Sequence, residues 1–218
     1  FRSLLNYARF SWLGTIKART FVWMDTIILN FFVVSSLIGI YEIAWRIASV
    51  FVLINISLTN SIFPEISDIS SKSDDYTEVR PLLQEAIKFS GVFVIPGFFG
   101  AVVVGSEILR IYGSEFTTGR TILLILILAR GVESYGHSYL TVLNAVDRPD
   151  ISFRINAVLV VANVGLNIIL IYAYGWYGAA IATLAASCLS LILSYAALSA
   201  LMDGIQTPIS EVFKQIFS

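Results

Sequence analysis

The sequence has 218 residues, of which 57% are hydrophobic and 13% are charged, and its mean hydropathy is +0.81. Soluble domains are nearer half apolar and a quarter charged, so this composition excludes an ordinary soluble domain. The formal net charge of -1 carries little information, because in a membrane protein the position of each charge matters more than the sum. The composition predicts a membrane protein.

Apolar runs of about 20 residues recur along the chain, and each is long enough to cross a hydrocarbon core of about 30 Å as a helix. They are continuously apolar, whereas the strands of a membrane β-barrel alternate over about ten residues. The predicted fold class is therefore all-α, a polytopic membrane helix bundle with about six transmembrane helices. The predicted spans are 13–34, 41–63, 87–104, 121–144, 151–172 and 177–201.

Two segments outside these spans are amphipathic. Pro64 predicts the end of the second helix, and the following loop, 65–86, includes helically spaced apolar residues that favour a position along the membrane interface. Residues 205–218 place Pro208 early in an amphipathic pattern, which predicts the start of a further helix. Because Phe1 is not methionine and no signal-peptide pattern follows it, we expect the protein to begin upstream.

Lysine and arginine residues are unevenly divided between the two sides of the predicted bundle. If the odd-numbered spans run outward from the cytoplasm, the outer side has only Arg110 and Arg120. The cytoplasmic side then carries Arg2, Arg9, Lys72, Arg80, Lys88, Arg148, Arg154 and Lys214. This bias agrees with the positive-inside rule and places the 65–86 loop in the cytoplasm. We therefore expect a multi-pass protein of the cytoplasmic membrane.

Polar residues lie on one face of several predicted helices, and such residues at membrane depth tend to face a bundle interior or a watery cavity. In the fourth span the residues that share a narrow arc are Arg130, Glu133, Ser134, His137, Thr141 and Asn144. In the second span Glu42 and Arg46 stand four residues apart, a spacing that allows a local ion pair. For that pair, a structural role at the outer interface is favoured over ligand binding.

The first span carries Lys17, Arg19 and Asp25, which cannot all face lipid. For Lys17, Arg19 and Arg130, a role in a cavity is favoured over a structural role. His137 is the only histidine, and a packing role is favoured over a proton relay, although its pKa range would suit one.

The fifth and sixth spans carry patterns that favour helix packing. Asn156, Asn163 and Asn167 line up on the fifth span, and hydrogen bonds to a neighbouring helix are favoured over ligand contact. The sixth span repeats small residues every four positions, which allows close approach of another helix. These are Gly178, Ala182, Ala186, Ser190 and Ser194.

Motifs for catalysis are missing from the sequence. Cys188 is the only cysteine and lies in an apolar segment, so the chain builds neither a disulfide framework nor a zinc site. There is no glycine-rich phosphate loop and no nucleophile–base pair. We therefore expect no enzyme, no cofactor and no metal.

Five segments resemble, in order, patterns of polysaccharide-type flippases in the multidrug/oligosaccharidyl-lipid/polysaccharide exporter superfamily, with wording closest to archaeal members. They are 34–48 (VSSLIGIYEIAWRIA), 61–67 (SIFPEIS), 108–116 (ILRIYGSEF), 143–149 (LNAVDRP) and 174–183 (YGWYGAAIAT). Family proteins have about 12 to 14 helices in two lobes that rock around a central cavity. The resemblance implies that this chain is the second lobe, without its last two helices, and that the first lobe of the same polypeptide is its partner.

The resemblance also implies a function, since members of this family move lipid-linked sugars across the cytoplasmic membrane. Lys17, Arg19, Arg46 and Arg130 become candidates for meeting the phosphate or pyrophosphate of a polyprenyl carrier, because arginine forms bidentate bonds with phosphate. Asp25, Glu133 and His137 become candidates for ion coupling or gating. Two alternatives stay open: a cation-coupled drug antiporter of the same superfamily, and a membrane glycosyltransferase or ligase acting through Asp147 and Asp150.

Overall fold

The computed structural model of the chain describes residues 24–72 and 78–202, and every regular element in those ranges is helical. Residues 24–32 form the first described helical segment. The elements that follow are α2 (Ser35–Lys72), α3 (Val79–Arg110), the 3-10 helix η1 (Ser114–Gly119), α4 (Arg120–Ala145), α5 (Pro149–Tyr174) and α6 (Trp176–Leu201). The predicted all-α bundle is confirmed.

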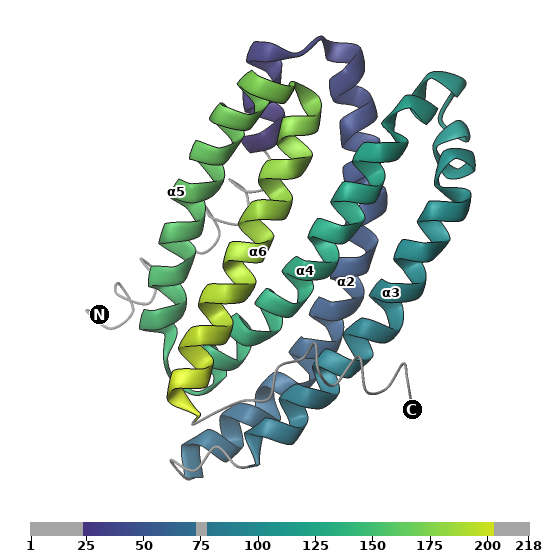
Figure 1. Cartoon of the computed structure of the whole chain (residues 1–218). Coiled ribbons are helices and arrows are strands. Elements are labelled where there is room, and N and C mark those ends of the chain that lie inside the picture. Colours follow the sequence, from purple (N-terminus) through teal and green to yellow (C-terminus); the bar gives the residue numbers. More distant parts are fainter. Residues whose placement is uncertain (1–23, 73–77, 203–218) are drawn as a thin grey trace, which may run out of the picture.

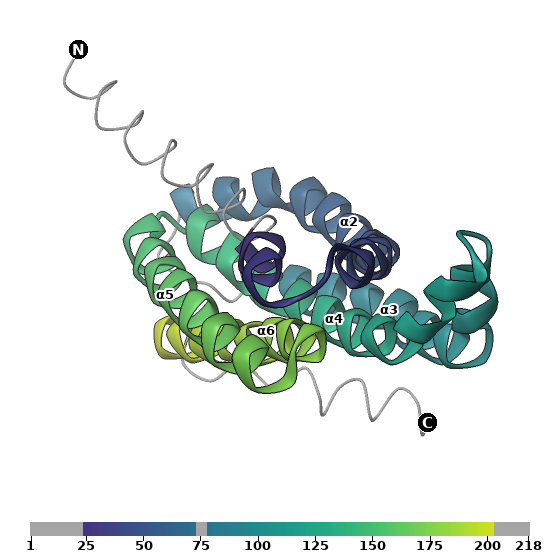
Figure 2. The same ribbon diagram turned by 90° about the horizontal axis from the view of Figure 1, so that it is seen from above.

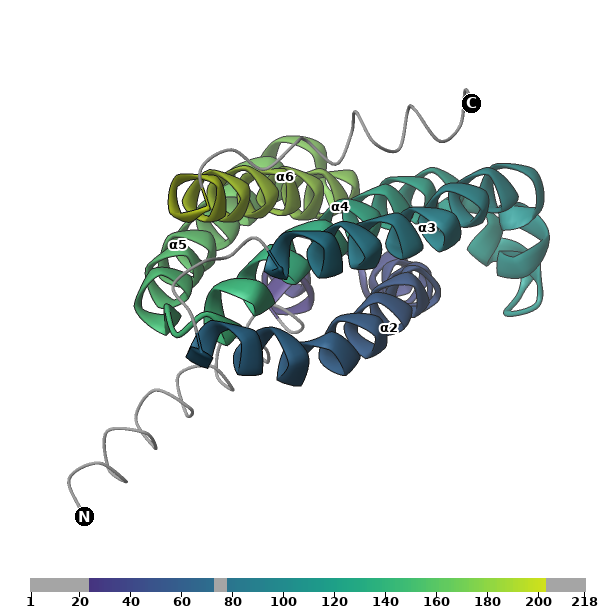
Figure 3. The same cartoon turned by 90° about the horizontal axis from the view of Figure 1, so that it is seen from below.

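The long helices run up and down in sequence order, as Figure 1 shows. Helix α4 is central, because it packs against α2, α3 and α6, while α5 packs mainly against α6 (Figure 2). Seen from below, α6, α4 and α3 form a row, and α5 and α2 lie on the same side of that row (Figure 3). Helices α2 and α5 therefore lie on the same face of the layer formed by α4 and α6 (Figure 3).

Buried apolar residues gather in two clusters, one toward each end of the bundle. The upper cluster includes Leu29, Tyr41 and Leu126, and the lower one includes Leu143 and Leu198. In the part of the chain that the structure describes, α3, α5 and α6 are long and apolar enough to cross a membrane. Helix α4 has a polar second half, as its sequence predicted, and most residues of that half are buried or half-buried in the bundle.

The structure differs from the predicted 65–86 loop. Helix α2 continues past Pro64 to Lys72, and α3 begins at Val79, so both ends of that segment are helical. A proline removes one backbone hydrogen bond, which by itself favours a break. Here tertiary packing compensates, since Ile66 and Leu83 are both fully buried in the lower cluster.

Tight turns connect α4 to α5 and α5 to α6. Asp147 adopts a positive φ of 57° between α4 and α5, a conformation that aspartate tolerates better than most residues. Gly175, with φ 59°, connects α5 to α6. A Cβ on Gly178 would lie 2.0 Å from the carbonyl oxygen of Leu170, so only glycine permits this approach of the two helices.

Candidate functional site

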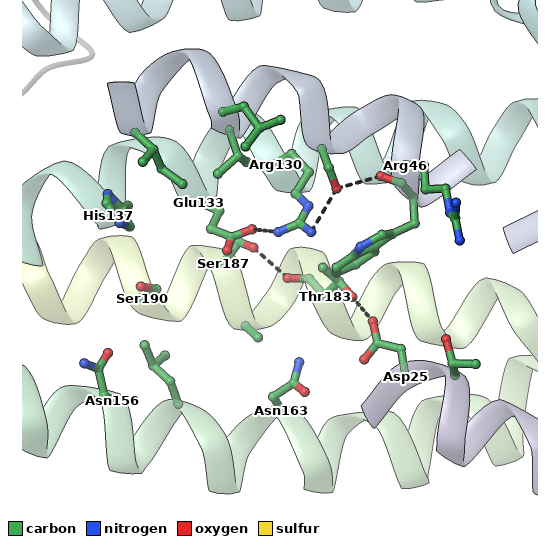
Figure 4. Close-up of a pocket in the computed structure, with 18 of the residues that line it drawn as sticks. Asp25, Arg46, Arg130, Glu133, His137, Asn156, Asn163, Thr183, Ser187 and Ser190 are labelled. Atoms are coloured by element: carbon green, nitrogen blue, oxygen red, sulfur yellow. Dashed lines mark hydrogen bonds and ion pairs between the residues drawn. The ribbon is translucent and has the colours of Figure 1, made fainter. Parts of the chain in front are cut away.

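A cavity of about 770 Å³ lies among α2, α4, α5, α6 and the 24–32 segment. Figure 4 shows that side chains from α4, α5 and α6 and from the 24–32 segment point into this space. The charged residues on its wall are Asp25, Glu42, Arg46, Arg130 and Glu133. Since the walls are otherwise mainly apolar and hydroxyl-bearing, these five groups dominate its chemistry.

Helix α4 brings three of the predicted polar residues to the cavity, because Arg130, Glu133 and His137 follow one another at helical spacing. The predicted polar arc is divided, however. Ser134 is fully buried and donates to the carbonyl oxygen of Gly131 at 2.7 Å instead of lining the cavity. Asn144 is exposed near the end of the helix.

Arg130 is held on several sides, although it lines the cavity. Its Nη1 donates to Oε2 of Glu133 at 2.5 Å, and its Nη2 donates to Oγ of Ser49 at 3.1 Å. The guanidinium carbon lies 3.8 Å from the ring centroid of Trp45, a cation–π contact. The residue is only 8% exposed. Arg130 therefore joins α4 to α2.

Arg46 and Glu42 form a looser pair on α2. Their closest atoms are 3.9 Å apart, and their side chains are 76% and 36% exposed. Glu42 also accepts a hydrogen bond from the Thr26 hydroxyl at 3.3 Å. Figure 4 shows Arg46 lying apart from Arg130 and Glu133, and among the described residues its one ion pair is the loose contact with Glu42.

Asp25 lies at one end of the cavity and is 2% exposed. Its Oδ2 accepts hydrogen bonds from the hydroxyls of Tyr41 at 3.0 Å and Thr183 at 2.9 Å. Its Oδ1 accepts from Nδ2 of Asn167 at 2.8 Å. The carboxylate thus connects the 24–32 segment with α2, α5 and α6.

The asparagines of α5 have different surroundings. Asn167 is fully buried and bonds Asp25, which confirms the predicted inter-helix hydrogen bond for this residue. It also donates to the backbone oxygen of Asn163 at 3.0 Å. Asn156 and Asn163 line the cavity, and Asn163 is only 3% exposed, with its side-chain oxygen accepting from Asn167 at 3.3 Å.

The residues on the cavity wall that the sequence analysis missed include Tyr41, Trp45 and Thr183, which contact its charged groups. Tyr41 and Trp45 stand four residues apart on α2, and their rings stack at 6.3 Å between centroids with an interplanar angle of 27°. The four-residue spacing of Tyr41, Trp45 and Ser49 could have predicted that all three lie on one face of α2. No local sequence pattern predicts the position of Thr183, because its partner Asp25 lies 158 residues away along the chain.

The remaining candidate residues are His137, Lys17 and Arg19. Nδ1 of His137 lies 3.4 Å from the Thr141 hydroxyl, one turn along α4. Lys17 and Arg19 fall outside the described residues. Across 24–72 and 78–202, no three His, Cys, Asp or Glu side chains converge as a metal site would require.

Known proteins resemble this chain over most of its length. It is 42% identical over 221 residues to the "Probable flippase AglR" of Haloferax volcanii, which covers 99% of this chain and 46% of that protein. It is 35% identical over 193 residues to the "Probable low-salt glycan biosynthesis flippase Agl15" of the same organism, covering 88% of this chain and 41% of that protein. The chain therefore spans less than half the length of both relatives.

No solved structure matches the chain. The model of the family described as "Lipid II flippase MurJ" matches residues 21–215, nearly the whole sequence. This match covers the described helices that build the cavity, and both relatives are archaeal proteins named as probable flippases, in line with the resemblance of the motifs. The chain belongs to the lipid II flippase MurJ family, within the superfamily that its five motifs indicated.

Proposed function

We propose that this chain is one lobe of a flippase that moves polyprenyl-phosphate-linked oligosaccharide or polysaccharide precursors across the cytoplasmic membrane by alternating access. Two relatives named as flippases support this activity, one of them named for glycan biosynthesis. Flippases are transporters and do not catalyse a chemical reaction, so we propose no enzymatic activity. Because the chain spans less than half of each relative, we further propose that another lobe of the same polypeptide completes the transporter.

The observation that supports this proposal most directly is an exposed arginine on the wall of a cavity in an apolar helix bundle. The Arg46 side chain is 76% exposed, and its nearest carboxylate is 3.9 Å away. A guanidinium with unused donors can grip a phosphate through two parallel hydrogen bonds. Arg46 would therefore be the first contact for the phosphate of the carrier.

The other candidate residues would have supporting roles. Arg130 would contribute positive charge from the inner wall, and Lys17 and Arg19 would add cations from the first span. Asp25, Glu133 and His137 would serve coupling or gating, because all three line the same cavity and can change their interactions when it opens or closes.

A cation-coupled antiporter of the same superfamily is the second candidate, and the buried carboxylate of Asp25 favours it. Transport of cationic dyes driven by a sodium or proton gradient would support this candidate. The glycosyltransferase reading has less support, because Asp147 and Asp150 do not line the cavity and Asp150 is bonded to Arg148 at 3.3 Å.

The test uses the full-length protein in vesicles that contain a lipid-linked glycan, with the flipped fraction measured by a membrane-impermeant glycan-modifying reagent. Arg46→Gln should slow flipping about tenfold or more, since a charge-assisted phosphate contact is lost. Arg46→Lys should retain part of the activity, because a point charge remains. Arg110→Gln is the matched control, since Arg110 also pairs with a glutamate but lies at the end of α3 outside the cavity. Unchanged flipping by Arg46→Gln would overturn the assignment of Arg46.

A further inference from the structure

The contacts of Arg130 are directed at protein groups and leave little for a ligand. A guanidinium has five N–H donors and two faces. Here Nη1 is bonded to Glu133, Nη2 is bonded to Ser49, and the ring of Trp45 lies 3.8 Å from the guanidinium carbon. Three N–H donors remain, and the one on Nε is buried and faces no acceptor among the described residues. Because the whole residue is only 8% exposed, a phosphate could reach these donors only if the side chain moved. Arg130 is built into the wall.

The two α2 groups that Arg130 holds are one helical turn apart. Trp45 and Ser49 are linked by a hydrogen bond from the Ser49 hydroxyl to the Trp45 carbonyl oxygen at 2.8 Å. Successive residues of an α-helix are rotated by about 100°, so fixing the direction of Trp45 and Ser49 also fixes the direction of Arg46. The contacts of Arg130 with Trp45 and Ser49 therefore bear on the side of α2 from which Arg46 projects.

A second polar tie joins the same two helices farther along. Oγ1 of Thr59 and Oγ of Ser138 are hydrogen-bonded at 3.2 Å, and both residues are buried. Two ties on one interface restrain rotation of α2 about its axis better than one does. The tie at Arg130 is the one beside Arg46, so it controls the orientation of that residue most directly.

We propose that Arg130 is a positioning residue for Arg46: through Trp45 and Ser49 it holds α2 at the rotation that presents Arg46 to the cavity. This inference rests on the proposed function, in which Arg46 meets the phosphate of a lipid carrier. It assigns Arg130 to the orientation of the cation that binds and not to binding itself. Glu133 accepts a hydrogen bond from the same guanidinium and therefore contributes to this positioning.

The inference predicts that lysine cannot replace arginine at position 130. A lysine ammonium keeps the positive charge but lacks the planar fork that bonds Glu133 and Ser49 while lying over Trp45. Arg130→Lys should therefore misplace Arg46 almost as much as Arg130→Gln does. If Arg130 met the phosphate directly as a charge, Arg130→Lys would retain part of the function, as Arg46→Lys is expected to.

The experiment measures the accessibility of position 46 without any glycan substrate. In the full-length protein with its native cysteines replaced, including Cys188→Ser, Arg46→Cys is labelled with a negatively charged methanethiosulfonate reagent. Arg130→Gln and Arg130→Lys should each change the labelling rate by about fivefold or more, the size of a typical coupling between sites. Arg110→Gln should leave the rate unchanged.

A companion variant keeps the test decisive if Arg130 variants fold poorly. Trp45→Leu removes the aromatic platform from the α2 side, and Ser49→Ala removes the acceptor of Nη2 with little loss of volume. Either change should shift the labelling rate in the same direction as Arg130→Gln. Unchanged labelling in all folded variants, with folding checked by size-exclusion chromatography, would overturn the positioning role.

The two proposals fail separately. If Arg46→Gln leaves flipping intact, the phosphate contact is wrong, whatever the labelling shows. If the labelling rate of Arg46→Cys does not change when Arg130 is replaced, the positioning role is wrong, even when Arg46→Gln abolishes flipping.

Discussion

The cavity wall carries two arginine–glutamate pairs with almost the same spacing along a helix and opposite surroundings. Arg46 and Glu42 on α2 are 3.9 Å apart, with side chains 76% and 36% exposed. Arg130 and Glu133 on α4 are 2.5 Å apart, with side chains 10% and 33% exposed, and Arg130 also bonds α2. Similar residue types thus have different roles, because burial and a third partner decide whether a charge holds the protein together or stays available.

The largest effect is expected at Asp25, the most buried charged group of this wall. Asp25→Ala removes three hydrogen bonds to a carboxylate, those from Tyr41, Asn167 and Thr183. Asn167 and Thr183 keep backbone acceptors, whereas the Tyr41 hydroxyl is left without an acceptor among the described residues. An unsatisfied buried donor costs about 1–3 kcal/mol, so the free energy of unfolding should fall by about 3 kcal/mol or more. Thermal unfolding of the full-length protein in detergent measures this. Asp25→Asn, which keeps one carbonyl oxygen, should lose less; if Asp25→Ala unfolds like Arg46→Ala, the contrast between buried and exposed groups is wrong.

A smaller loss is expected when the inner pair is broken. Arg130→Met removes the partner of Glu133 and the tie to Ser49, and should lower the free energy of unfolding by about 2 kcal/mol, less than for a fully buried pair because Glu133 is partly exposed. Combining it with Glu133→Gln should restore about 1 kcal/mol, since no unpaired charge remains. Strict additivity of the two substitutions would show that the pair is not coupled.

The smallest change in stability is expected at the outer pair. Arg46→Gln should alter the free energy of unfolding by no more than about 0.5 kcal/mol, because exposed ion pairs contribute little. Arg110→Gln, which breaks the exposed pair of Arg110 with Glu107, should change the free energy of unfolding by a similarly small amount. Denaturation of both variants beside the parent protein gives the comparison. A loss of 2 kcal/mol or so for Arg46→Gln would mean that this residue is structural, as the sequence analysis had favoured.

The features that the sequence could predict are those that depend on neighbours in the chain. The helical class follows from long apolar runs, and the cavity face of α4 follows from the helical spacing of Arg130, Glu133 and His137. The Asp25 network could not be predicted, because its partners Tyr41, Asn167 and Thr183 lie 16, 142 and 158 residues away along the sequence. The continuation of α2 past Pro64 was missed for a similar reason, since distant packing around Ile66 offsets a local penalty.

The length of α2 has a mechanical consequence. Its 38 residues correspond to about 57 Å of helix, nearly twice a hydrocarbon core of about 30 Å, so α2 is too long to lie wholly within one crossing of that core. Ser49 and Lys72 are 23 residues apart, a lever arm of about 35 Å. A tilt of about 10° around the Arg130 contact would sweep Lys72 through about 6 Å, by the same helix geometry. A spin label or fluorophore at Lys72 would therefore amplify small movements beside the cavity into displacements that spectroscopy resolves.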